Sequence, residues 1–283
     1  MSKIFLCAIN NILSGNCSED CAFCTQSAHF HADIPKYKLK EISQILQEAK
    51  QAKANGAIGY CLVTAGKGLD DKKTQAVARV AYEIKKELPD FNLIGCNGTA
   101  SKEQLQYLKE HGIDSYNHNL ESSKEYYQKI CSTHSWEERY QTCLNVKELG
   151  LNLCTGGIYG MGESFEDRVS LIDAIASLKP QSTPINYFIP NPALPLKANS
   201  ISFDEALAVI DMIKTKLPDA RVMVAGGREL IFDTEEKEQL MYKKGVSAIV
   251  IGDYLTTKGL AVELDRDRLK RYGLEVATSC HEK

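Results

Sequence analysis

Apolar residues recur along the chain in two patterns that alternate from one end to the other. Short β-like runs predict strands, and longer stretches with an apolar residue every three or four positions predict amphipathic helices. The predicted strands are 3–9, 58–64, 92–97, 113–119, 150–155, 183–188, 220–225 and 247–251. The predicted helices are 40–54, 72–88, 101–111, 122–130, 135–149, 164–178, 203–217 and 234–244. Several helices open with a capping pair, as in Ser101 with Gln104, Ser164 with Asp167 and Ser202 with Glu205.

Strands that alternate with helices in this way predict an α/β protein with a (β/α)8 TIM-type barrel. A doubly wound open sheet is the alternative, but eight regular units favour closure, which removes the edge strands. No linker or low-complexity stretch divides the chain. We therefore expect one domain over residues 1–283, in which residues 258–283 form a C-terminal extension.

Composition narrows the class of protein further. The chain has 283 residues, of which 43% are hydrophobic and 25% are charged, and its formal net charge is -3. This balance argues against binding of nucleic acid or of a membrane surface. No apolar run approaches the roughly 18 residues of a spanning helix, and a signal-peptide core is not evident. We expect a cytoplasmic protein.

Three of the ten cysteines fall in one short stretch, where Cys17, Cys21 and Cys24 follow C-x3-C-x2-C spacing. A structural zinc site normally takes four ligands, and a 4Fe–4S cluster held by only three thiolates leaves one iron open to a small molecule. The alternatives are three unrelated cysteines or half of a zinc site. In a reducing compartment, metal binding is favoured over disulfides.

Strand parity brings a second set of cysteines together. Successive residues of a strand point to opposite faces of the sheet. If the apolar residues of strand 150–155 face the helices, Cys154 faces the barrel interior. The same argument places Arg221 and Met223 on the inward face of strand 220–225. Cys61 lies on the row of strand 58–64 opposite Tyr60 and Leu62, and Cys96 lies near the end of strand 92–97. A single inward-facing cysteine is usually an ordinary packing residue. Cysteines from three separate strands in one barrel interior instead indicate a second, deeper iron–sulfur site.

The Cys17–Cys24 stretch resembles the signature of the radical S-adenosylmethionine (SAM) enzymes. Within them the chain is similar to the biotin synthase family over residues 5–255. The matching stretches are Cys17–Ser27, Tyr60–Thr64, Cys96-Asn-Gly, Tyr116–Glu121, Ile130–His134, Cys154–Glu163, Pro184–Asn186 and Ala225–Glu229.

This resemblance implies that the enzyme inserts sulfur into dethiobiotin to give biotin. Its cofactors would be a 4Fe–4S cluster on Cys17, Cys21 and Cys24, SAM on the open iron, and an auxiliary 2Fe–2S cluster or a variant that donates the sulfur. The resemblance assigns the auxiliary cluster to Cys61, Cys96 and Cys154. It also implies a reductant of flavodoxin or ferredoxin type and a homodimer.

The resemblance assigns the remaining contacts residue by residue. Phe23 would pack near the adenine of SAM, and Glu121 would bind its ribose. Asn117 and Asn119 match a stretch that lies against dethiobiotin and SAM. Asn186 matches a residue that contacts the ureido ring, which suits an amide because both groups offer a donor and an acceptor.

One position departs from the family pattern. An Arg that ligates the auxiliary cluster is expected five residues before Arg228, where this chain has Met223. Either Arg221, two residues earlier on the same strand face, is the fourth ligand, or the auxiliary cluster differs in type or ligation. Two other functions remain open at this point: another radical SAM barrel enzyme acting on a different small molecule, and a non-catalytic iron–sulfur electron-transfer protein.

Overall fold

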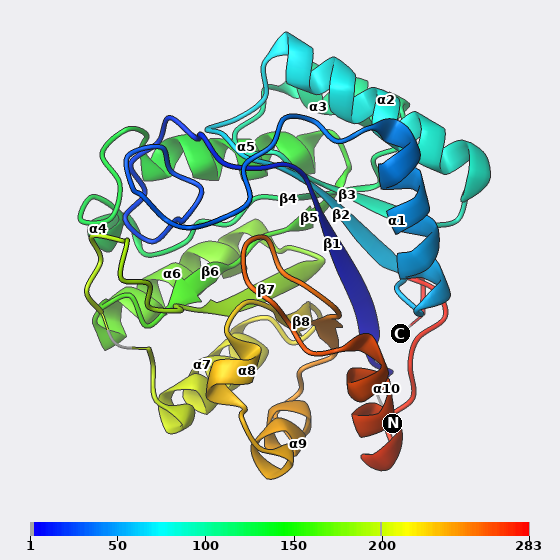
Figure 1. The fold of residues 1–283 in the computed structure, drawn as a ribbon. Helices are drawn as coiled ribbons and strands as arrows, with labels where there is room; N and C mark the ends of the chain where they lie inside the picture. The colour runs from blue at the N-terminus through cyan, green and yellow to red at the C-terminus, as the bar shows by residue number, and fades with distance from the viewer. Residues whose placement is uncertain (1–2, 199, 283) are drawn as a thin grey trace.

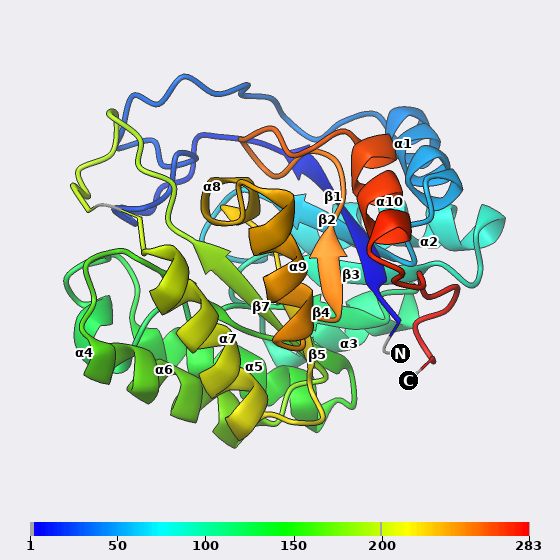
Figure 2. The same ribbon diagram turned by 90° about the horizontal axis from the view of Figure 1, so that it is seen from below.

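A closed parallel barrel with helices on its outside forms the body of the molecule (Figures 1 and 2). The computed structural model describes residues 3–198 and 200–282, so the ends of the predicted domain, residues 1–2 and 283, lie outside the described residues. The strands are β1 Phe5–Leu13, β2 Gly59–Thr64, β3 Asn92–Cys96, β4 Ser115–Asn117, β5 Asn152–Cys154, β6 Gly157–Tyr159, β7 Ser182–Tyr187, β8 Arg221–Val224 and β9 Ala248–Val250.

The strands pair in the order β5-β4-β3-β2-β1-β9-β8-β7-β6, with a further pairing of β5 and β7 that closes the ring. Strands β5 and β6 are successive segments that both pair with β7, through Cys154–Ser182 and through Gly157–Ile185. They therefore share one of the eight barrel positions. The predicted TIM-type barrel is confirmed, and each of its eight expected strands is present.

Helices connect the strands and cover the barrel. They are α1 Ile42–Ala54, α2 Asp71–Glu87, α3 Lys102–Glu110, α4 Lys124–Tyr127, α5 Trp136–Glu148, α6 Phe165–Leu178, α7 Phe203–Lys216, α8 Arg228–Ile231, α9 Glu235–Lys243 and α10 Val262–Arg271. The expected capping boxes of Ser101, Ser164 and Ser202 are all formed. The helix expected over 122–130 is only α4, because the chain then turns toward the N-terminal loop, where the Ala22 N–H donates to the carbonyl of Ile130.

Side-chain parity separates the core into an outer and an inner layer. Tyr60, Leu62, Leu153 and Val222 are buried in the large apolar cluster that includes residues of the surrounding helices. The alternate strand positions, including Cys7 and Met223, pack in a smaller cluster of their own. This alternation leaves the lumen lined by cysteine, asparagine and small residues rather than by a continuous aliphatic core.

The two ends of the described chain meet at the lower end of the barrel (Figure 1). Ile4 forms a parallel bridge with Val276, and the Lys3 ammonium lies 2.6 Å from the Glu282 carboxylate.

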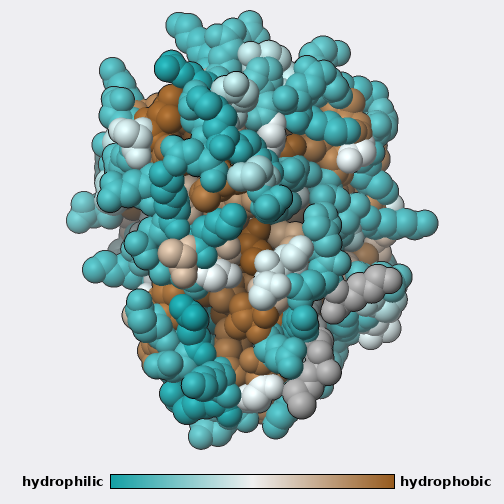
Figure 3. Space-filling model, turned by 90° about the vertical axis from the view of Figure 1, so that its right-hand side faces the viewer, coloured by the Kyte–Doolittle hydropathy of each residue, from teal (hydrophilic) through white to brown (hydrophobic). Residues whose placement is uncertain are grey.

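Figure 3 shows that hydrophilic side chains cover most of one face, with hydrophobic residues visible in a central band. Among the described residues, no helix is both long enough and apolar enough to cross a membrane.

Candidate functional site

The loop after β1 carries Cys17, Cys21 and Cys24 and is folded back on itself by backbone hydrogen bonds. The Cys17 N–H donates to the Gln26 carbonyl at 3.0 Å, and the Cys17 carbonyl accepts from the Ala28 N–H at 2.7 Å. Inside this loop the Cys24 N–H donates to the Cys21 carbonyl at 2.9 Å. A contiguous stretch therefore presents three thiols from a small hydrogen-bonded frame, as expected from their spacing.

Two of these thiols are close to a third residue that the sequence placed in the site. Burial raises the pKa of Cys24 to about 11, and the nearby Cys17 and Glu121 shift it in the same direction. Cys17, Cys24 and Glu121 therefore share one neighbourhood, although Glu121 comes from the loop after β4. Phe23 packs against the apolar cluster that also contains Cys21 and Tyr126.

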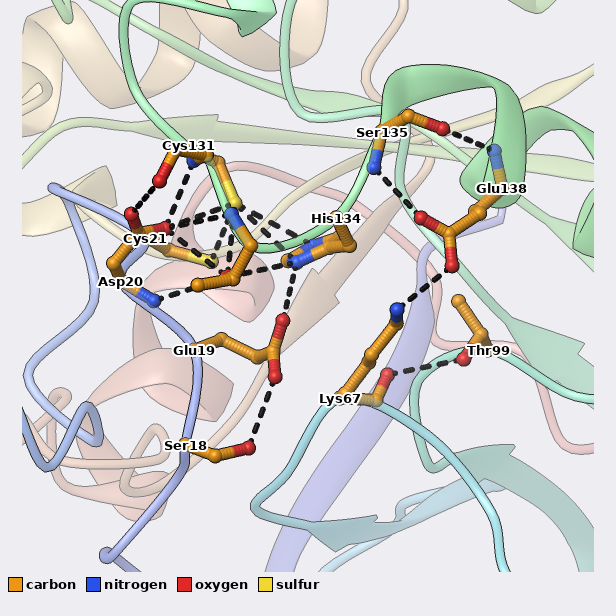
Figure 4. Close-up of polar contacts among 12 residues, drawn as sticks. Ser18, Glu19, Asp20, Cys21, Lys67, Thr99, Cys131, His134, Ser135 and Glu138 are labelled. Atoms are coloured by element: carbon orange, nitrogen blue, oxygen red, sulfur yellow. Dashed lines mark hydrogen bonds and ion pairs between the residues drawn. The ribbon is translucent and has the colours of Figure 1, made fainter.

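A second segment, residues 130–134, holds the cluster loop from outside (Figure 4). The Asp20 carboxylate accepts from the backbone N–H groups of Ser132 at 2.9 Å and Thr133 at 3.2 Å. Cys131 and His134 of this segment come within hydrogen-bonding distance of Cys21 and Glu19, respectively. The sequence pattern assigned these two residues no function, and their contacts depend on the long-range fold.

Cys61, Cys96 and Cys154 lie on β2, β3 and β5, and the sheet register fixes their heights in the barrel. Cys96 is the register partner of Val63, and Cys154 is the partner of Asn117. Burial raises the pKa of Cys61 well above its ordinary value, and nearby Cys7, Cys96 and Cys154 raise it further. The structure thus gathers the three predicted cysteines in the lumen.

Cys7 is a fourth thiol in this group, which the sequence reasoning missed. It lies on β1 beside Gly59 of β2 in the sheet register, and it packs in the same small cluster as Met223. Its inward position follows from the alternation of side chains along β1. A count of inward positions on this strand could have identified it, but a lone cysteine near the start of a chain is usually only a small buried residue.

Arg221 is the first residue of β8 and lies at the end of the barrel where the strands begin. Its guanidinium carbon stands 3.5 Å from the centroid of the Phe5 ring, and Nη2 donates to the Cys280 carbonyl at 3.2 Å. Burial lowers the pKa of Arg221, against the opposing influence of Cys280, Cys7 and Cys154. The guanidinium is therefore close to the lumen thiols, but its recorded contacts are with an aromatic ring and the C-terminal segment.

Three acceptor atoms above the lumen are buried without a hydrogen-bond partner in the described part of the chain: Asn117 Oδ1, Asn119 Oδ1 and Glu121 Oε2. The Glu121 carboxylate lies 3.7 Å from Arg139, and burial nevertheless raises its pKa. Glu121 also has a positive φ of 68°, which costs energy for a residue with a side chain. Orphaned acceptors in a strained segment fit a ligand that brings N–H and O–H donors, as SAM does.

The amide of Asn117 also reaches the lumen, because Nδ2 donates to Cys96 Sγ at 3.2 Å. The Asn186 amide lies on β7, where Nδ2 donates to the Gly157 carbonyl at 3.3 Å and Oδ1 accepts from the Gly226 N–H at 3.1 Å. Asn186 would therefore have to share these backbone partners with any bound ligand. Asn117 is placed between both parts of the site.

A surface cleft of about 700 Å³ lies beside the cluster loop. Its lining includes Cys17, Lys67 and Lys73, but neither of the other cysteines of the loop nor the asparagines above the lumen. The cleft therefore borders the site from outside, and the orphaned acceptors mark the interior of the barrel as the place for ligands.

Family models match most of the chain. The Radical SAM superfamily model matches residues 11–175, and the Biotin and Thiamin Synthesis associated domain matches residues 184–275. Biotin synthase from a Sulfurovum species is 64% identical over 98% of this chain and 97% of its own length. Biotin synthase from a Nitratiruptor species is 59% identical over 99% of this chain and 100% of its own.

Solved structures agree on the architecture. Methylornithine synthase superposes with a TM-score of 0.80 at 17% identity, covering 97% of this chain and 84% of that one. The FeFe-hydrogenase maturase HydG from Carboxydothermus hydrogenoformans also gives 0.80, at 15% identity over 96% of this chain and 67% of its own. At such identities the likeness concerns the fold alone. The sequence relatives, which extend over nearly the whole length, decide the family: this chain belongs to the biotin synthases of the radical SAM superfamily.

Proposed function

We propose that this chain converts dethiobiotin to biotin with two iron–sulfur centres, one on each of its cysteine triads. The main observation behind this proposal is that one barrel contains three cysteines on a single loop and three more on separate strands that line its lumen. An electron-transfer protein needs no open iron beside a set of unpartnered buried acceptors. The family membership likewise disfavours an unrelated substrate.

Cys17, Cys21 and Cys24 would hold the 4Fe–4S cluster, and Cys61, Cys96 and Cys154 would hold the auxiliary cluster. When bound, these centres and SAM supply a 5′-deoxyadenosyl radical that abstracts hydrogen and a sulfur atom that replaces it. The protein orients the reactants between the two triads and excludes water there. The pKa values of the three lumen thiols are raised, so metal binding would displace their protons.

Asn119 and Glu121 would bind SAM, with Glu121 accepting hydrogen bonds from the ribose hydroxyls. Arg139 supports this arrangement, because Nη1 donates to the Asn119 carbonyl at 2.7 Å and lies near the Glu121 carboxylate. Phe23 would contact the adenine from the cluster loop. Asn117, Asn119 and Asn186 would contact dethiobiotin, with the amide of Asn186 facing its ureido ring.

Arg221 would be the fourth ligand of a 2Fe–2S auxiliary centre, because Met223 occupies the position where the family pattern expects the arginine. Cys7 is the specific rival, since it is a lumen thiol near Cys61 and thiolates are the ordinary ligands of such clusters. Mössbauer spectra of the reconstituted Arg221→Ala and Cys7→Ser proteins separate the two candidates. The variant that removes the true ligand changes the auxiliary spectrum and leaves the 4Fe–4S spectrum intact.

The partners follow from the same chemistry. A flavodoxin or ferredoxin type protein would reduce the loop cluster, the active form would be a homodimer, and the enzyme would work in the cytoplasm. The decisive test of function is anaerobic incubation of the reconstituted protein with SAM, dithionite and dethiobiotin, followed by mass spectrometry. Biotin together with 5′-deoxyadenosine is expected. SAM cleavage without biotin would point to another substrate, and absence of cleavage by a cluster-loaded protein would contradict the proposed radical chemistry.

A further inference from the structure

Three metal-binding side chains meet behind the cluster loop, on the side where residues 130–134 pack, and a carboxylate adjoins one of them (Figure 4). The thiols of Cys21 and Cys131 are 3.7 Å apart, and Cys131 Sγ is 3.3 Å from His134 Nδ1. Possible ligand atoms of these three residues all lie within 4.8 Å of one another. The Glu19 carboxylate joins them, with Oε2 2.8 Å from His134 Nδ1. We call Glu19, Cys21, Cys131 and His134 the rear cluster.

The spacing of these atoms fits a single tetrahedral ion. Two thiolates bound to zinc at about 2.3 Å stand about 3.8 Å apart at the tetrahedral angle, and a thiolate and an imidazole nitrogen stand about 3.5 Å apart. The measured separations of 3.7 Å and 3.3 Å are close to both values. Two sulfurs and one nitrogen are also a donor set that favours zinc over magnesium or calcium.

Hydrogen bonds on both ring nitrogens fix the orientation of His134. Its Nε2 lies 2.8 Å from the Tyr127 hydroxyl, which also accepts a hydrogen bond from Arg139 Nε at 2.7 Å. At 2.8 Å from the Glu19 carboxylate, Nδ1 carries a proton that it donates to Oε2. An ion that binds Nδ1 displaces this proton, and a proton on Nε2 is then donated to Tyr127. Such a second hydrogen bond is the usual way in which proteins fix the tautomer of a metal-binding histidine.

The rear cluster is also buried and held in place before any ion arrives. Glu19, Cys21, Cys131 and His134 are each less than 9% exposed. Asp20 fixes the two segments against each other through the backbone of Ser132 and Thr133. Both oxygens of Glu19 and both ring nitrogens of His134 have hydrogen-bond partners, which hold these side chains in fixed positions.

We propose that, before the iron–sulfur cluster is assembled, Cys21, Cys131 and His134 bind one zinc-type divalent ion beside Glu19, and that this ion competes with the cluster for Cys21. The competition rests on the proposed role of Cys21 as a cluster ligand, whereas binding of the ion does not. An ion held here occupies the thiol of Cys21, and displacement of the ion makes this thiol available to the cluster. The rear cluster would thus control access of iron to the loop.

Cobalt is the probe for the binding step, because its thiolate complexes absorb light where zinc does not. The parent protein carries Cys17→Ser, Cys24→Ser and Cys96→Ser, so that neither iron–sulfur triad is complete while the rear cluster is intact. Under anaerobic reducing conditions we expect one equivalent of cobalt with a sulfur-to-cobalt charge-transfer band. Adding Cys131→Ser or His134→Gln should weaken binding at least tenfold, and adding Cys280→Ser is the matched control. A parent that binds no cobalt, or a Cys131→Ser form that binds it equally well, overturns the proposal.

Reconstitution of the otherwise unchanged chain tests the competition. Zinc added before iron and sulfide should slow the appearance of the 4Fe–4S spectrum several-fold, and this delay should shrink in Cys131→Ser but not in Cys280→Ser. Equal delays in Cys131→Ser and the unsubstituted chain contradict the competition. A chain that assembles no 4Fe–4S cluster even without zinc contradicts the proposed function instead, so the two failures are distinguishable.

Discussion

The two cysteine triads are built in opposite ways. Cys17, Cys21 and Cys24 lie within eight residues on one loop, and local backbone hydrogen bonds set their spacing. Cys61, Cys96 and Cys154 are separated by dozens of residues, and the register of β2, β3 and β5 brings them together. The loop triad therefore depends on a local frame, whereas the lumen triad depends on the closure of the whole barrel. The proposed functions assign SAM binding to the local triad and sulfur donation to the triad that the sheet assembles.

Loss of a loop cysteine should have the largest effect. In Cys17→Ala or Cys24→Ala the 4Fe–4S cluster loses one of three ligands, so both SAM cleavage and biotin formation should fall below detection. Chromatography of 5′-deoxyadenosine and electron paramagnetic resonance of the reduced protein measure the two losses. Cys280→Ala is the control. Retained SAM cleavage in either variant would break the assignment of the loop.

Loss of a lumen cysteine should separate the two centres. Cys96→Ala removes an auxiliary ligand and also leaves the Asn117 amide without its sulfur acceptor, but it does not touch the loop. We expect an unchanged 4Fe–4S signal together with at least a tenfold loss of biotin. Iron and sulfide analysis with mass spectrometry of the product checks both. A normal biotin yield would rule out the auxiliary triad as the sulfur source.

Glu121→Gln tests the proposed SAM site beside the cluster loop. A neutral amide accepts weaker hydrogen bonds than a carboxylate, so SAM affinity should fall by about 1–2 kcal/mol, or roughly five- to thirtyfold. Equilibrium binding to the cluster-loaded protein measures this directly. Arg139 then loses its anionic neighbour, so the melting temperature must be recorded in parallel. An unchanged affinity at unchanged stability would remove Glu121 from the SAM site.

Glu205 gives the smallest effect and depends on pH. Hydrogen bonds from Ser202 and Arg168 lower the pKa of this carboxyl from 4.5 to about 2. A lowered folded-state pKa adds stability above the unfolded value of about 4.5, and this stability is lost as the pH falls toward 2. Since its side chain is half exposed, Glu205→Gln should cost less than about 1 kcal/mol. Denaturant unfolding at pH 7 and pH 4 should show the cost shrinking; a constant difference would contradict the ion pair.

The barrel could be predicted from the sequence because the patterns that indicate its strands and helices are local. Apolar periodicity and capping pairs such as Ser164 with Asp167 reveal where helices begin, and side-chain parity assigned Cys154 and Arg221 to the lumen. Segment β6 and helices α8 and α10 were missed. Segments of three or four residues such as β6 and α8 carry no clear period, and the acidic and basic residues of α10 mask its apolar face.

The parts of the site that could not be predicted depend on long-range contacts. Nothing in the spacing of Cys131 indicates that its thiol meets Cys21 across 110 positions. The proximity of Cys7 to Cys61 likewise appears only when β1 is paired with β2. The family pattern identified Met223 as a departure, but only the fold shows which side chains surround it.

Mössbauer spectroscopy of the anaerobically reconstituted protein, recorded with and without SAM, tests the central claim most directly. Two distinct iron–sulfur populations are expected, and SAM should shift one iron of the 4Fe–4S cluster while leaving the auxiliary spectrum unchanged. A single cluster population, or a 4Fe–4S spectrum that does not respond to SAM, would contradict the division of labour between loop and lumen.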